Sequence, residues 1–153
     1  MRFHQTSVMQ EGLVAAKLNA HEKIVSAMHD ITEGGVLGAV YELAAASGNG
    51  VLVEHDKLPI GNTQRRVCAL FDLDPCRCIG AGAMLLRVKR GHEQTVIDAL
   101  AHAHIPCTAI GRMCNAEAGM QLVATDGTLQ PLTYQARDPY WAAFFLALQK
   151  NWP

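Results

Sequence analysis

The sequence has no long hydrophobic run and no strong excess of either charge. Nothing in it approaches the ~20 apolar residues that a membrane-spanning helix needs, and residues 1–4 do not begin the apolar segment of a signal peptide. Thirteen Lys and Arg residues face 14 Asp and Glu residues, which leaves a net charge of −1. Because nucleic acids and anionic membranes attract strongly basic proteins, we expect neither as a partner.

The cysteines are odd in number and irregularly spaced. There are five, an odd number that does not form a disulfide framework, so we expect reduced thiols and a cytoplasmic protein. Cys76 and Cys78 form one close pair, but the usual structural zinc site needs a second matching pair. We therefore expect no bound metal and interpret both cysteines as structural.

The composition is that of a globular domain. Half of the 153 residues are apolar and 18% are charged, as in folded chains of one domain. Apolar residues at helical or alternating spacing predict the secondary structure. The predicted helices are residues 7–19, 35–46, 62–73, 92–104 and 139–148, and the predicted strands are 24–28, 50–55, 83–88, 107–113, 120–124 and 129–132. This order predicts an α+β fold with a mixed β-sheet of about 4–6 strands, covered mainly on one face by helices.

Two of the predicted helices carry apolar stripes that we expect to face the core. In residues 62–73 the stripe consists of Val67, Leu70 and Phe71. The last helix begins with Asp138 as a cap and Pro139 at its first position. Its stripe consists of Tyr140, Trp141, Phe144, Phe145 and Leu148.

The chain is organised around one turn in which a strand ends and a helix begins. Asp30 and Thr32 are favourable N-cap residues, and Gly34 and Gly35 leave the backbone without Cβ atoms where the helix starts. Free N–H groups at a helix N-terminus form an anion site, whereas the carboxylates of Asp30 and Glu33 favour a hydroxyl, an amine or a metal-bound phosphate. Capped turns of this kind are also common as purely structural features, so the residues alone support both interpretations.

The residues of this turn resemble a known signature. Met-His-Asp-Ile-Thr-Glu-Gly-Gly-Val-Leu-Gly-Ala-Val-Tyr-Glu-Leu-Ala, at residues 28–44, is similar to the segment that opens the C-terminal domain of the AIR synthase-related superfamily. The motif is closest to the hydrogenase-maturation branch, hydrogenase expression/formation protein E and its relatives. Weaker similarities follow in the same order at residues 68–75, 80–86, 109–111 and 137–141.

The resemblance implies the fold of that C-terminal domain and a candidate site. The implied substrate- or phosphate-binding residues are His29, Asp30, Thr32, Glu33, Gly34 and Gly35. Asp30 would orient substrate or metal, Thr32 would donate a hydroxyl hydrogen bond, and the two glycines would offer backbone N–H groups. No catalytic residue is assigned. If Gly35 has helical dihedral angles, a valine there is expected to weaken ligand binding at a modest cost in stability.

The resemblance also implies a missing partner. In two-domain members an N-terminal domain carries the ATP-binding segment and most metal-binding acidic residues, and no Gly-x-x-x-x-Gly-Lys loop or acidic cluster precedes the turn here. We therefore expect residues 1–153 to be a single C-terminal domain, without the N-terminal ATP-binding domain that would be its partner. A small-molecule substrate and a second copy, in a homodimer, are the other expected partners.

The resemblance implies ATP and Mg²⁺ as cofactors of the two-domain protein, with neither bound by this domain alone. The implied chemistry activates an amide-type oxygen by phosphorylation so that it can be displaced. Two other hypotheses are a stand-alone module that binds a small molecule or phosphate, and a structural or interaction domain. One difference leaves the branch open: hydrogenase expression/formation protein E ends in a tail with a reactive Cys, whereas the last cysteine here is Cys114.

Overall fold

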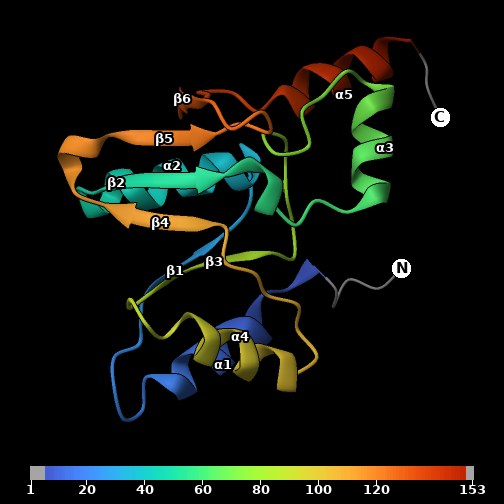
Figure 1. Ribbon diagram of the computed structural model, residues 1–153. Coiled ribbons are helices and arrows are strands. Elements are labelled where there is room, and N and C mark those ends of the chain that lie inside the picture. Colours follow the sequence, from blue (N-terminus) through green and yellow to red (C-terminus); the bar gives the residue numbers. More distant parts are fainter. Residues whose placement is uncertain (1–5, 151–153) are drawn as a thin grey trace. The chain divides into compact units, whose positions relative to one another are not determined.

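The computed structural model describes residues 6–150, which form two compact units (Figure 1). Unit 1 consists of Met1–Ile31 and Ala81–Ala109, and unit 2 consists of Thr32–Gly80 and Ile110–Pro153. The predicted α+β class is confirmed, and the strands divide between a two-stranded sheet in unit 1 and a four-stranded sheet in unit 2. Within residues 6–150, no helix combines the length and apolar character needed to cross a lipid bilayer.

Unit 1 is a pair of strands packed with two helices. Strands β1 (Val25–Asp30) and β3 (Met84–Val88) pair antiparallel. Helices α1 (Met9–Leu18) and α4 (Glu93–His102) lie side by side (Figure 1), and α1 also contacts β1. Apolar side chains from all of these elements enclose one small core, whose buried residues are Ala15, Ile24, Val25, Val96 and Leu100.

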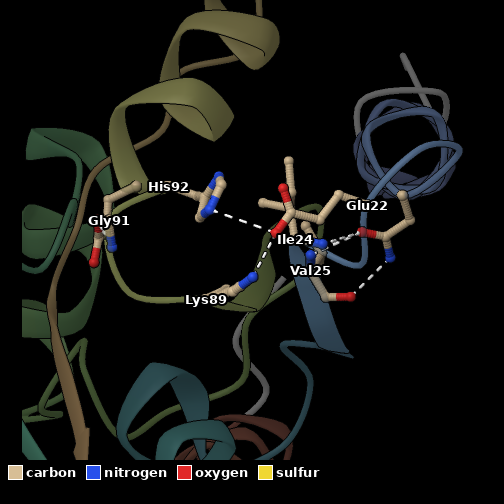
Figure 2. Close-up of polar contacts among 8 residues, drawn as sticks. Glu22, Ile24, Val25, Lys89, Gly91 and His92 are labelled. Carbon is tan, nitrogen blue, oxygen red and sulfur yellow. Dashed lines mark hydrogen bonds and ion pairs between the residues drawn. The ribbon is translucent and has the colours of Figure 1, made fainter.

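Polar contacts fix the entry into β1 (Figure 2). The Asn19 side chain accepts hydrogen bonds from the N–H groups of Ile24 (2.9 Å) and Val25 (2.8 Å) and donates one to the Val25 carbonyl (2.7 Å). On the surface, Glu22 pairs with Lys89, whose hydrogen bond and charge lower the pKa of the Glu22 carboxyl. The Asn19 hydrogen bonds therefore set where the strand begins. The exposed ion pair contributes little to the stability of the fold.

Unit 2 is built on a mixed sheet in the order β4-β2-β5-β6. The central strand β2 (Gly50–Glu54) runs antiparallel to β4 (Gly111–Cys114) and parallel to β5 (Met120–Val123), and β5 pairs antiparallel with β6 (Leu129–Pro131). Helix α2 (Gly35–Ser47) lies along one face of this sheet and contacts β2 (Figure 1). The buried residues of α2 are Gly35, Val36, Leu37, Ala39, Val40 and Ala44.

The predicted inward face of the third helix is wrong. Helix α3 (Asn62–Leu70) ends three residues earlier than predicted, where the Leu73 N–H donates to the Cys68 carbonyl (2.9 Å). Val67 and Leu70 are 49% and 75% exposed, Phe71 is half-buried, and Cys68 is the buried side chain of the helix. The spacing of apolar residues indicated a helix but did not show which of its faces packs against the rest of unit 2.

The apolar stripe of the last helix is also exposed. Helix α5 (Pro139–Gln149) begins as predicted, with Asp138 as its cap, but no residue between its ends is buried. Trp141, Phe144, Phe145 and Leu148 are 39–55% exposed, and the three aromatic rings contact one another instead of a core. Two 3₁₀ helices, η2 (His55–Lys57) and η3 (Ala116–Ala118), complete the described elements of unit 2.

Candidate functional site

The six predicted site residues fall in both units. His29 and Asp30 end strand β1 in unit 1, where their backbones pair with Leu85 and Met84. His29 is half-buried and Asp30 is exposed. Thr32, Glu33, Gly34 and Gly35 form the turn before α2, in unit 2. The geometry described below is that of these four residues, which we call the α2 turn.

The α2 turn is capped by glycine rather than by a side chain. Gly34 (φ 78°) is the N-cap of α2 and Gly35 (φ 63°) is its first residue, and both lie in the left-handed region. The prediction that Asp30 or Thr32 caps the helix is therefore wrong, because the helix begins later than a cap at either position requires. Thr32 contributes its carbonyl instead, which accepts hydrogen bonds from Gly80 N–H (2.9 Å) and Gly35 N–H (3.4 Å).

A buried carboxylate lies against the α2 turn. Asp138 is 5% exposed, and its Oδ2 accepts a hydrogen bond from the Gly34 N–H at 2.7 Å. Its other oxygen, Oδ1, accepts the Tyr140 N–H at 2.8 Å and caps α5. One carboxylate thus binds the N-terminal ends of two helices, where a negative charge is stabilised. The N–H group that was expected to bind an external anion already binds this internal one.

The other side of the turn rests on the segment after α3. The Leu37 N–H donates to the Cys76 carbonyl (3.0 Å). A Cβ on Gly35 would lie 2.7 Å from the Cys76 carbonyl oxygen and 2.8 Å from that of Cys78. We call residues 76–80 the connector. The second glycine of the motif is therefore required by contact with the connector inside the protein, and a ligand is not needed to explain it.

Most of the chain matches a known family. The model of the family described as AIR synthase related protein, C-terminal domain, matches residues 5–121. The chain belongs to this family. The match contains the α2 turn, the connector and most of the core of both units, and it ends within β5, so α5 and its cap Asp138 lie beyond it.

Hydrogenase maturation proteins are among the relatives of this AIR synthase related domain. Over 80 residues it is 38% identical to carbamoyl dehydratase HypE of Escherichia coli K12, covering 52% of this chain and 24% of that protein. The crystal structure of E. coli HypE, a hydrogenase maturation protein, superposes with a TM-score of 0.73 at 27% identity, covering 86% of this chain and 41% of that one. A HypE structure in complex with ATP has a TM-score of 0.71 at 20% identity, covering 83% of this chain and 41% of that one. At this identity the similarity supports a shared fold and nothing more.

The chain therefore spans about a quarter of the curated relative and 41% of the solved HypE chains. On the α2 turn of this domain, Thr32 and Glu33 are exposed to solvent. The Glu33 Oε1 accepts a hydrogen bond from the Trp141 Nε1 at 3.2 Å, a neighbour that the sequence analysis did not identify. A hydroxyl and a carboxylate in this position suit a neutral or amine-bearing group better than a bare phosphate.

Proposed function

We propose that this AIR synthase related domain is the C-terminal part of a HypE-like, ATP-dependent enzyme that activates an amide-type oxygen by phosphorylation. The observation that carries the proposal is the 38% identity to E. coli carbamoyl dehydratase HypE. Dehydrating a carbamoyl group means removing its oxygen, and attachment of a phosphoryl group makes that oxygen easier to displace. The geometry of the α2 turn supports a role in holding the polar substrate group.

The described residues do not fit a complete site for ATP and Mg²⁺. Within residues 6–150, no three or more His, Cys, Asp and Glu side chains gather so that they could hold a metal ion. The Gly34 N–H, the expected phosphate donor, binds Asp138. The proposal therefore assigns ATP and Mg²⁺ to an N-terminal ATP-binding domain, and this chain supplies the surface that meets the substrate there.

Within this function, each exposed group of the α2 turn has a specific role. The Thr32 hydroxyl donates a hydrogen bond to the substrate. The Glu33 carboxylate, held by Trp141, accepts one from a substrate N–H or O–H group. The expected role of Asp30, at the exposed end of β1 in unit 1, in orienting substrate stays a prediction from the motif. Assembly as a homodimer and a cytoplasmic location stay predictions of the same proposal.

A second candidate is an interaction domain without catalysis. The observation that favours it is the exposed apolar face of α5, because soluble domains rarely expose several large apolar side chains together unless a partner covers them. The third hypothesis, a stand-alone phosphate module, is weakened because the α2 turn already holds a carboxylate.

We expect the isolated 153-residue chain to hydrolyse no ATP above background, because the described residues offer no metal site. Phosphate release with Mg²⁺–ATP is the measurement, first on the chain alone and then after mixing it with the ATP-binding domain of a HypE relative. Activity is expected only in the mixture. Robust, metal-dependent hydrolysis by the chain alone would contradict the two-domain proposal, and an inactive mixture would favour the interaction domain.

We expect Thr32→Val to lower the activity of the assembled enzyme by roughly 2–10-fold, the range for losing a neutral hydrogen bond. Glu33→Gln should lower it by roughly 10–100-fold, the range for losing a hydrogen bond to a charged group. Both side chains are exposed, so melting temperatures should stay nearly unchanged. The glutamine side chain retains an oxygen that can accept the hydrogen bond from the Trp141 indole N–H. Glu117→Gln, at an exposed position in η3, is the matched control. Full activity in both turn variants would remove the α2 turn from the site.

A further inference from the structure

Two buried thiols of unit 2 lie in direct contact. Cys68 on α3 is 6% exposed and Cys78 in the connector is 5% exposed, and their Sγ atoms are 3.4 Å apart. A disulfide bond is about 2.05 Å long, so bonding needs a movement of little more than 1 Å. The buried Cys76 lies elsewhere, with its Sγ 3.8 Å from the His55 Nε2.

We propose that Cys68 and Cys78 are a site of reversible disulfide formation that responds to peroxide and links oxidation to the α2 turn. One sulfur attacks a peroxide oxygen, the O–O bond breaks, and a sulfenic acid and one water form. The second sulfur then displaces the sulfenic oxygen as a second water, and the S–S bond forms. Two thiols are oxidised and one hydrogen peroxide is reduced. This inference does not depend on the function proposed above.

The link to the α2 turn comes from the position of Cys78 in the connector. The turn and the first residues of α2 are hydrogen-bonded to the connector on either side of Cys78. Cys76 accepts the Leu37 N–H at 3.0 Å, and the Gly80 N–H donates to Thr32 at 2.9 Å. A covalent bond from Cys78 to α3 therefore fixes the segment on which the turn rests. It also closes a short loop, which removes conformational freedom from the unfolded chain.

The surroundings of the pair set its reactivity. Burial, followed by the hydrogen bond with Cys68, raises the pKa of the Cys78 thiol to about 12, and the negative charges of Asp138 and Asp74 act in the same direction. Because the thiolate is the reactive form, the raised pKa makes Cys78 slow to react at neutral pH, and burial limits the access of peroxide to both sulfurs. The pair therefore responds to sustained oxidation, whereas Cys107 is exposed to solvent.

The pair can be identified by peptide mapping of the full chain after treatment with hydrogen peroxide and alkylation of the remaining thiols. Trypsin cuts after Arg66, Arg77 and Arg87, so residues 67–77 contain Cys68 and Cys76 and residues 78–87 contain Cys78. We expect these two peptides to be joined, in the parent and in Cys76→Ser, which excludes a bond from Cys76. A product in which Cys68 and Cys78 are alkylated after oxidation would overturn the proposal.

The effect on the protein is measured on the same samples. Oxidation should raise the melting temperature by roughly 5–10 °C, the gain for closing a loop of this size, and reduction should reverse it. The shift should be absent in Cys68→Ser and Cys78→Ser and retained in Cys107→Ser. Hydrogen exchange at the amides of Leu37 and Gly80 should slow several-fold, with Glu54 in β2 as the reference. A disulfide that leaves these amides and the melting temperature unchanged would disprove the link to the turn.

Discussion

Replacing Gly35 with alanine should lower the free energy of unfolding by about 2–5 kcal/mol, whereas the same change at Gly48 should cost about 1–2 kcal/mol. The two glycines have nearly the same backbone angle, with φ at 63° and 64°. They differ in what a Cβ would meet. At Gly35 it would lie 2.7 Å and 2.8 Å from two carbonyl oxygens of the connector, and at Gly48 there is nothing within 4 Å.

The pair of variants separates strain from contact. A left-handed conformation costs an alanine about 1–2 kcal/mol at either position, so the difference between the two variants reports the collision with the connector. Denaturant unfolding of the full chain provides the measurement, with an unchanged m-value required for the comparison. Equal losses in both variants would mean that the connector moves aside easily.

This result would also decide how the glycine motif is interpreted. The sequence associates Gly35 with the approach of a ligand, and a valine there is expected to cost little stability if the residue is helical. Gly35 is left-handed, so this condition is not met, and the Cys76 carbonyl lies where a Cβ would be placed. A Gly35→Val variant would therefore lose activity by unfolding, and the exposed Thr32 is the better position for testing the site.

Asp138→Asn should lower the free energy of unfolding by about 2–4 kcal/mol, because one side-chain oxygen is replaced by an N–H donor that faces a backbone N–H. The carboxylate of Asp138 is buried and accepts hydrogen bonds from Gly34 and Tyr140. Asp126→Asn is the matched control. Asp126 accepts the N–H of Thr128, also two residues ahead, but it is exposed, so water replaces the lost contact with little effect.

A third variant tests whether the α2 turn can hold an external anion. Asp138→Ala leaves the Gly34 N–H without its acceptor, so inorganic phosphate should raise the melting temperature of this variant and leave the parent unchanged. Phosphate that stabilises the parent equally would mean that another group of the chain binds it. Asp138→Asn with the stability of the parent would show that the carboxylate is not needed for either helix.

Local patterns predicted the elements well because they depend on neighbouring residues. The alternation and helical spacing around the turn predicted β1 and α2, and Asp138 with Pro139 predicted the start of α5. The same reasoning failed where the decisive contact lies far along the chain. Nothing near Gly34 indicates that Asp138 will bind it, and nothing within α3 indicates that Cys68 will be the buried side chain.

The candidate site was predicted in the same uneven way. The positions of Thr32 and Glu33 on an exposed turn follow from the motif. The sequence could not tell why Gly35 is a glycine, because a missing Cβ can make room for a ligand or for the protein's own backbone, and the contact with the connector identifies the second reason. Trp141 was predicted as a core residue, yet its indole N–H reaches the Glu33 carboxylate from the surface.

The hydrogen bond between Gly34 and Asp138 joins residues 104 positions apart. A ribosome adds roughly 5–20 residues per second, so roughly 5–20 s pass between the synthesis of the donor and that of its acceptor. During this interval the N-terminus of α2 has been synthesised, but Asp138, the acceptor of the Gly34 N–H, has not. The α2 turn, whose residues are made early, is therefore among the last parts of unit 2 to reach its final form during translation.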